Sequence, residues 1–334
     1  MTPGRPGDNA GPPRLPPRRA GPPAALVEVV GMLCVLVGLI VVFGLLTEHF
    51  FSRTTFYMIA AQVPDAAIAA VGMTFVLIIA GIDLSVGSVL ALGGAVLGVA
   101  IVRWHVPVPL AVSACLAVGL LCGAVNGLVT VAWRLPSFIV TLGMLEVARG
   151  ATMTVLDSRT AYVGSAIEGI SEAAFLYLPV PFVLALLTVA GGQLVLTYTA
   201  FGRHVVAVGS SEETARLCGV NVPAVKLRVF ALCGLLASLA GVMQVSRAAS
   251  ANPNAGTGFE LETIAAVVIG GTSLMGGRGS VVRSFFGVLI IAVLTSGLAQ
   301  LGVQDPTKRI ITGLVIVAAV VLDYYRQRLG RRPA

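Results

Sequence analysis

The chain has 334 residues, of which 57% are hydrophobic and only 11% are charged, and its mean hydropathy is +0.94. Soluble domains carry about 25% charged residues, so this composition excludes an ordinary soluble protein and predicts helices embedded in a lipid bilayer. The formal net charge of +7 fits basic loops on the cytoplasmic face of a membrane, and no nucleic-acid partner is expected.

The first 24 residues are rich in proline, glycine and arginine and contain no apolar run. They are expected to form a disordered cytoplasmic tail. Arginines directly before the first apolar segment predict an uncleaved first span with its N-terminus inside the cell. Residues 25–325 are interpreted as a single transmembrane domain, and residues 326–334 as a basic cytoplasmic tail.

Ten apolar segments are predicted to cross the membrane as helices, because a span needs about 20 mostly apolar residues. In chain order they cover residues 26–46, 58–80, 85–102, 108–133, 137–156, 180–198, 227–245, 260–274, 281–301 and 310–322. The eighth is short, and a re-entrant course is an alternative for the third and the eighth. The fold class is therefore all-α and polytopic, and the bias of lysine and arginine toward the predicted inner segments supports cytoplasmic termini.

Two segments outside the predicted spans are long. Residues 157–179 are expected outside the cell, and residues 201–226 inside. The inner segment contains a predicted short helix over residues 212–217, with a serine N-cap, acidic residues in its first turn and a glycine after its end. The residues concerned are Ser210 or Ser211 at the cap, Glu212 and Glu213 in the first turn, and Gly219 at the end. Two interpretations stay open: a helix resting on the bilayer, or a docking point for a soluble partner.

Two glycine-rich stretches resemble each other, at residues 79–88 and 269–280. Each stands between apolar segments and shares glycine, leucine and serine at similar spacing. Such interrupted helices in corresponding places indicate a duplicated transporter fold with two pseudo-repeated halves. The freed backbone groups of a broken helix can border a water-filled path.

The sequence contains no recognisable catalytic or metal-binding motif. The three histidines are far apart, and the phosphate-binding pattern G-x-x-x-x-G-K-[ST] is absent, so no cofactor is expected in this chain. If transport uses ATP with magnesium, another subunit must bind them. The five cysteines lack metal or disulfide spacing. Four are interpreted as small apolar residues within spans, and Cys218 as a loop thiol.

Polar residues at membrane depth are the candidate functional positions, because a buried carboxylate costs about 2.5 to 3.5 kcal/mol on insertion scales. Such residues either cap broken helices or line a translocation path. The candidates are Gln62, Asp65, Asp83, Ser85, Asn126, Thr141, Asn252, Asn254, Thr272 and Ser273. Asp83 lies near a predicted turn, which favours the capping role. Asn252 and Asn254 belong to a polar outer loop, which either receives a solute or a delivering protein or is an ordinary connection between spans.

Several motifs resemble the ribose-type permease subunits of ABC importers. They are AVGMTFVLIIAGIDLSVGS at residues 70–88, Asn126-Gly127, LPSFIVTLGM at 135–144 followed by Ala-Arg-Gly, NPNAGTGFEL at 252–261 and IAAVVIGGTSLMGGRG at 264–279. The resemblance covers residues 55–325 in the expected order, and the proline-rich tail lies outside it.

The resemblance implies an inner-membrane subunit that imports a monosaccharide or related polyol by alternating access. Its implied partners are a second permease chain, either a copy or a sister chain, two cytoplasmic ATPase subunits and an extracytoplasmic solute-binding protein. The implied ATPase contact is the cytoplasmic segment with Ser211, Glu212, Glu213, Arg216, Gly219 and Asn221.

Three other functions remain as alternatives. An ion-coupled secondary transporter would use Asp65, Asp83 and Glu146 as coupling carboxylates. Within the same family, a permease for branched-chain amino acids or nucleosides shares the fold. A membrane scaffold without transport activity would not need the paired glycine-rich interruptions.

Overall fold

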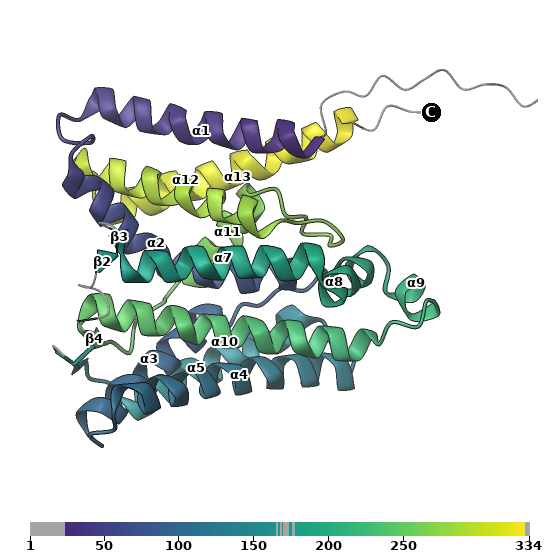
Figure 1. The fold of residues 1–334 in the computed structure, drawn as a ribbon, viewed down its shortest axis with the longest axis horizontal. Helices are drawn as coiled ribbons and strands as arrows, with labels where there is room; N and C mark the ends of the chain where they lie inside the picture. Colours follow the sequence, from purple (N-terminus) through teal and green to yellow (C-terminus); the bar gives the residue numbers. More distant parts are fainter. Residues whose placement is uncertain (1–23, 165, 168, 170–173, 176–177, 331–334) are drawn as a thin grey trace, which may run out of the picture.

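The computed structural model describes residues 24–164, 166–167, 169, 174–175 and 178–330, and within these it is a bundle of helices (Figure 1). The helices are α1 (Ala24–Leu46), α2 (Arg53–Ile78), α3 (Val86–Val102), α4 (Val108–Ala132), α5 (Ser137–Val155), α7 (Val180–Tyr198), α8 (Ala200–Ser210), α9 (Glu212–Leu217), α10 (Val222–Ala248), α11 (Phe259–Ile269), α12 (Val281–Gln300) and α13 (Asp305–Gly330). The predicted disordered tail falls almost wholly outside the described residues. The predicted basic tail begins as helix, because α13 continues to Gly330.

Short strands occur at one end of the bundle. They are β1 (Ala161–Tyr162), β2 (Ala174–Phe175), β3 (Leu178–Pro179) and β4 (Ser250–Ala251), with β1 paired antiparallel to β4 and β2 to β3. We call this the strand end, and the opposite end, where α8 and α9 lie, the α9 end (Figure 1). The first described residues of α1 and the C-terminal part of α13 both lie at the α9 end, so the two termini share one face.

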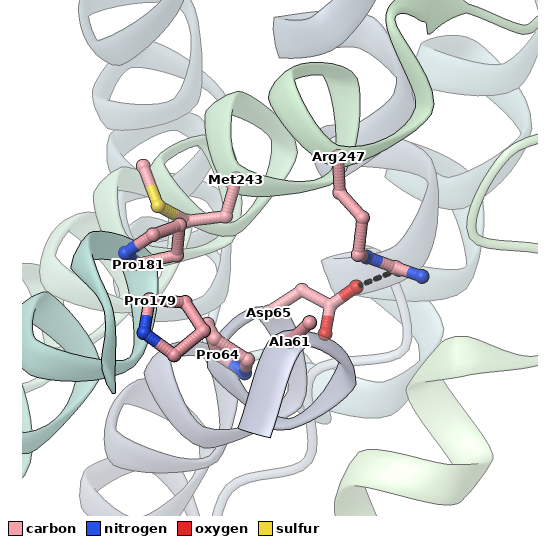
Figure 2. Close-up of a pocket in the computed structure, with 7 residues that line it drawn as sticks. All are labelled: Ala61, Pro64, Asp65, Pro179, Pro181, Met243 and Arg247. Atoms are coloured by element: carbon pink, nitrogen blue, oxygen red, sulfur yellow. Dashed lines mark hydrogen bonds and ion pairs between the residues drawn. The ribbon is translucent and has the colours of Figure 1, made fainter. Parts of the chain in front are cut away.

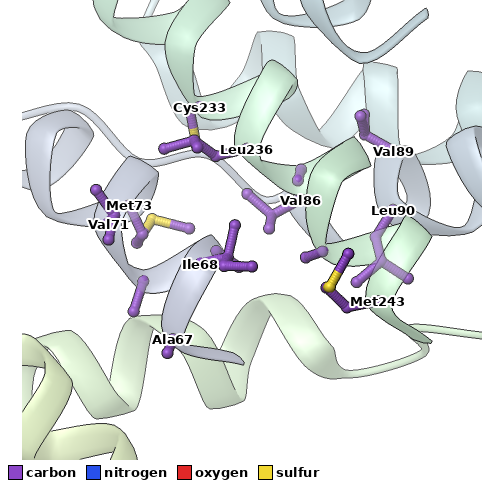
Figure 3. Packing of buried hydrophobic residues seen from close by; sticks show 14 of the residues in the cluster. Ala67, Ile68, Val71, Met73, Val86, Val89, Leu90, Cys233, Leu236 and Met243 are labelled. Carbon is purple, nitrogen blue, oxygen red and sulfur yellow. The ribbon is translucent and has the colours of Figure 1, made fainter. Parts of the chain in front are cut away.

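Three helices, α2, α3 and α10, form the core of the bundle. Almost every residue of α3 is buried, and α2 and α10 are buried along most of their length. Ile68 on α2, Val86 and Leu90 on α3, and Met243 on α10 interlock in this core (Figure 3). The other long helices cover it, and α1, α4 and α5 keep broad apolar faces exposed, as expected for helices in lipid.

Small residues allow α4 and α10 to pack closely. A Cβ atom on Gly123 would overlap the carbonyl oxygen of Phe230, and one on Gly234 would overlap that of Gly119. Helices in lipid associate by close packing because no hydrophobic effect drives them together, and glycine permits the shortest approach. The abundance of glycine in the sequence therefore reflects contacts between helix backbones.

The structure confirms a polytopic helical protein but not the count of ten spans. Within the described residues, seven helices are long and apolar enough to cross a bilayer: α1, α2, α4, α5, α7, α10 and α12. The third predicted span is the shorter α3, with 17 residues. The eighth is α11, with 11 residues, which at 1.5 Å per residue covers about half of the hydrocarbon layer.

Candidate functional site

Two helices of the core break in the same way. After α2, Ala80 adopts a left-handed conformation and residues 79–85 form a link to α3; after α10, Ala249 does the same and residues 249–258 lead to α11. The link after α2 therefore resembles the α10–α11 connection, because each begins with a left-handed alanine and leads to a shorter helix. Residues 269–280, the second glycine-rich stretch of the internal repeat, also link two helices, α11 and α12. This link follows α11, which is only half as long as a full span.

The two broken segments meet inside the bundle at the beginnings of α3 and α11. A Cβ atom on Gly87 would overlap the carbonyl oxygen of Gly256, and one on Gly256 would overlap that of Gly87. From this contact α3 runs to the strand end, where Gly98 packs against Ala251 of β4, and α11 runs to the α9 end. The glycines are needed here because only bare backbones can come this close.

A buried polar network stabilises the beginning of α3. Asp83 accepts hydrogen bonds through Oδ1 from the backbone N of Ser85 at 2.9 Å and from its Oγ at 2.6 Å. Asn126 on α4 donates through Nδ2 to the same Ser85 Oγ at 3.0 Å. All three side chains are at most 1% exposed. The Asp83 side chain therefore holds Ser85, the residue directly before the first turn of α3, although no side chain accepts a hydrogen bond from that turn.

Helix α5 holds the link between α2 and α3 from the other side. Thr141 Oγ1 donates to the carbonyl of Ile82 and accepts from the N of Leu84, both at 3.1 Å. Ser137 Oγ accepts from the N of Ile82 at 3.0 Å. Backbone groups freed by the break thus find side-chain partners within the protein, as a broken helix in a membrane requires. Ser137 was missed from the sequence because a serine at a helix start is unremarkable by itself.

The beginning of α11 is also acidic. Glu260 and Glu262 lie in its first turn, where carboxylates interact favourably with the helix dipole. The Oε2 atom of Glu260 is buried against Gly87 and has no hydrogen-bond partner among the described residues. Arg149 on α5 donates to the carbonyl oxygens of Pro253 and Ala255, at 3.1 and 2.7 Å, and so fixes the loop before α11.

Asp65 lies apart from this network and forms an ion pair between α2 and α10. Its Oδ2 accepts a hydrogen bond from Nη2 of Arg247 at 2.8 Å (Figure 2). The Asp65 side chain is 8% exposed and that of Arg247 is 38% exposed. Arg247 was not among the candidates from the sequence. It lies in the last turn of α10, where a basic residue is expected for its interaction with the helix dipole alone.

The remaining candidates lie at several places. Gln62 is exposed on α2, and Asn252 and Asn254 are exposed on the loop before α11, where Asn252 Oδ1 accepts from the N of Asn254 at 2.8 Å. Thr272 is buried and shares a hydrogen bond with Ser284 on α12, and Ser273 accepts from the N of Met275 in a turn. These residues do not converge on one cluster.

The predicted short helix exists with the predicted cap. Ser211 Oγ accepts from the N of Thr214 at 3.2 Å at the beginning of α9, and Glu212 pairs with Lys226 at the beginning of α10. Gly219 follows α9 with a φ of +82°. The sequence missed α8, whose buried Val205 and Val208 are spaced as on one helical face. Helix α8 lies at the end of α7, and α9 projects beyond it at the α9 end (Figure 1).

The end of α8 contacts both glycine-rich stretches. The N of Gly277 donates to the carbonyl of Ile78, the last residue of α2, at 2.8 Å. A Cβ on Gly209 would overlap this carbonyl, and Cβ atoms on Gly276 and Gly277 would lie 2.8 Å from Gly209 O and Ser210 Oγ. The residues just before the Ser211 cap thus form a rigid contact with the end of α2 and with the link before α12.

A bundle of membrane-spanning helices with two broken helices that meet inside it defines the permease component of a transport system. The family described as "Branched-chain amino acid transport system / permease component" matches residues 55–320, and the chain belongs to this family.

Curated relatives agree with this assignment. The chain is 41% identical to the ribose import permease protein RbsC of Escherichia coli (strain K12), over 93% of this chain and 98% of that protein. It is 37% identical to the fructose import permease protein FrcC of Rhizobium meliloti, over 89% and 86%. It is 32% identical to the xylose transport system permease protein XylH of Escherichia coli (strain K12), over 90% and 93%. No solved structure matches the chain significantly.

Proposed function

We propose that this chain is the permease subunit of a sugar importer of the ABC class and that it forms half of the path for a monosaccharide or related polyol. The observation that carries this proposal is the contact of the end of α8 with Ile78, directly before the first break, and with Gly277 in the link between α11 and α12. A push on α9 from the cytoplasm reaches these two connections through contacting backbones. That arrangement suits a permease moved by a separate ATPase.

The assembly follows from this role. A second permease chain completes the path. Two cytoplasmic ATPase subunits bind ATP and magnesium and dock on α9. An extracytoplasmic solute-binding protein delivers the solute at the strand end. Ser211, Glu212, Glu213, Arg216, Gly219 and Asn221 form the proposed ATPase contact. The chain then lies in the inner membrane with both termini and α9 in the cytoplasm, which agrees with their common side in Figure 1.

The electrostatics of the two breaks favour a neutral solute over an amino acid. In transporters with broken helices, free helix beginnings can bind the carboxylate of a substrate. Here the carboxyl groups of Asp83 and Glu260 already occupy the beginning of α3 and the first turn of α11. A substrate carboxylate would have to compete with them, whereas sugar hydroxyls can hydrogen-bond to such groups. The sugars in the names of the relatives support the same choice.

The carboxylates also weaken the ion-coupled alternative. Asp65 is paired with Arg247, Asp83 is engaged by Ser85, and Glu146 is exposed on α5. They lie on different elements with different partners, and among the described residues no group of three acidic, histidine or cysteine side chains could hold a metal ion. Each carboxyl group that the ion-coupled alternative requires is therefore either held by a neighbouring side chain or exposed on the surface of the bundle.

Uptake by the assembled transporter in proteoliposomes tests the proposal. Radiolabelled D-ribose, D-fructose and D-xylose are offered with the solute-binding protein outside, and ATP is enclosed or omitted. We expect uptake of at least one sugar that requires enclosed ATP and persists with an ionophore. Uptake that collapses with the ionophore, or ATP hydrolysis by this chain purified alone, would contradict the proposal.

A further inference from the structure

A cavity of about 250 Å³ opens near the strand end, between α3, α10 and the loop before α11. Leu90 and Ala91 form its wall on α3, Gln244 and Arg247 line it from α10, and Asn252 and Ala255 line it from the loop. Holding a water molecule takes only about 10 to 15 Å³, so this space is large enough for a small organic solute. A smaller cavity of about 20 Å³ shares Arg247 with it.

Free hydrogen-bonding groups line the α10 and loop sides of the cavity. Gln244 is half-buried, and its amide has no hydrogen-bond partner among the residues that the structure describes. Asn252 uses Oδ1 for the N of Asn254, which leaves its Nδ2 group as a donor. An amide offers both donors and acceptors, which is the combination that a hydroxyl group, itself a donor and an acceptor, requires.

The charge in the cavity is already balanced. Arg247 pairs with Asp65 at 2.8 Å on the side of the 20 Å³ cavity (Figure 2). Arg247 also lines the larger cavity. A further anion is therefore not needed to neutralise it. The opposite wall, formed by Leu90 and Ala91, is apolar and suits the C–H face of a sugar ring. A mostly apolar concave surface with a few placed polar groups is typical of small-molecule sites.

We propose that this cavity is a low-affinity subsite for a neutral monosaccharide on the outer half of the path, with Gln244 as the residue that hydrogen-bonds a sugar hydroxyl. This inference rests on the proposed function and adds the position and the recognising residue. Binding there is weak, because a solute held tightly within a path would leave it slowly. Asn252, which the sequence placed in a solute-receiving loop, is the second polar contact.

The test compares two substitutions of Gln244 in the assembled transporter. Gln244→Met keeps the length of the side chain and removes its hydrogen bonds, whereas Gln244→Glu keeps an acceptor. The probe is whichever of D-ribose, D-fructose and D-xylose the wild type imports fastest. We expect Gln244→Met to lower ATP-driven uptake about tenfold, the effect of one lost hydrogen bond, and Gln244→Glu to lower it less. ATPase activity stimulated by the binding protein should stay within about twofold in both.

Monodeoxy analogues of the same sugar separate recognition from a structural effect. The penalty of Gln244→Met should vanish for the analogue that lacks the hydroxyl bound by Gln244 and persist for the others. Ala255→Leu, which fills the cavity from the loop, should lower uptake of every analogue. Ser113→Ala, which removes a polar group from the exposed face of α4, is the control for folding and should transport normally.

Each outcome has a distinct meaning. If the wild type imports none of the three sugars in an ATP-dependent way, the proposed function fails. If the wild type imports a sugar but Gln244→Met and Ala255→Leu equal it, the subsite is refuted while the function stands. An equal penalty of Gln244→Met for all deoxy analogues would likewise refute the assigned contact.

Discussion

At the scale of single residues, polar groups in this protein connect helices rather than gather at one centre. Asp83 and Ser85 hold the beginning of α3, Thr141 satisfies the link before it, and Asp65 joins α2 to α10 through Arg247. Each lies at a place where the helical hydrogen-bond pattern ends or where two helices meet. Their energetic effect is therefore on the stability and alignment of the breaks.

The Asp65–Arg247 pair provides a first prediction at this scale. Replacing Asp65 with Asn leaves a half-exposed guanidinium without its counter-charge, and we expect a loss of about 2 kcal/mol in the free energy of unfolding. The double variant Asp65→Asn/Arg247→Met should recover part of this loss, because no unpaired charge remains. Unfolding in detergent, measured for the four proteins of the cycle, checks the coupling. If the stability losses of the two single variants simply add up in the double variant, Asp65 and Arg247 do not interact energetically.

Gly219 provides the second prediction. Its φ of +82° strains any side chain, especially a β-branched one, although no atom lies within 4 Å of where a Cβ would be. Gly219→Val should therefore cost about 1 to 2 kcal/mol and distort the end of α9, so that sugar-stimulated ATPase activity and uptake both fall.

A matched control exists at the other end of the bundle. Gly302, which follows α12, has a φ of +74° and equally open surroundings. Gly302→Val should lose similar stability but keep sugar-stimulated ATPase activity and uptake near those of the wild type. If both variants transport equally well, the role assigned to the end of α9 is wrong.

At the scale of elements, the end of α8 is the part that joins the cytoplasmic unit to the bundle. Gly209 touches the end of α2, and Gly276 and Gly277 of the link before α12 pack on Gly209 and Ser210. Two connections of the bundle therefore share one contact with the short segment that precedes α9. A displacement of α9 cannot leave them unchanged, because close-packed backbones do not compress.

Substitution of Gly209 tests this contact. A methyl group in Gly209→Ala would overlap Ile78 O, so α8 must move away from α2. We expect uptake to fall about tenfold or more while ATP hydrolysis continues, because a shift of about 1 Å in a coupled assembly is enough to misalign it. Gly191→Ala, on α7 with open space around it, is the matched control and should behave as the wild type. If Gly209→Ala still couples ATP hydrolysis to uptake as the wild type does, this contact does not transmit movement from α9 to the bundle.

At the scale of the whole molecule, the bundle is asymmetric between its ends. The strand end carries the short strands and the loop before α11, and the α9 end carries α8, α9 and both ends of the described chain (Figure 1). An importer needs this asymmetry, because its solute arrives on one side and its driving subunits bind on the other. The proposed orientation puts α9 in the cytoplasm.

Labelling of the native cysteines tests that orientation. Cys218, at the end of α9, is exposed, and Cys34 is exposed on the apolar surface of α1. A charged maleimide that does not cross membranes should label Cys218 in inside-out vesicles and spare it in right-side-out vesicles. Cys34 should stay unlabelled in both, because the reagent does not enter lipid. A Cys218→Ser variant is the control for the labelled site, and labelling from the outside would reverse the proposed topology.

The sequence by itself determined the all-helical membrane class, the positions of most helices and the capped helix α9, because these depend on local composition and on cap residues such as Ser211. Only the tertiary structure decided that α11 is a half-length helix, that α3 and α11 begin at a shared contact of Gly87 and Gly256, and that Asp65 pairs with Arg247. Those features depend on backbones that are far apart along the chain and touch only after the bundle has packed.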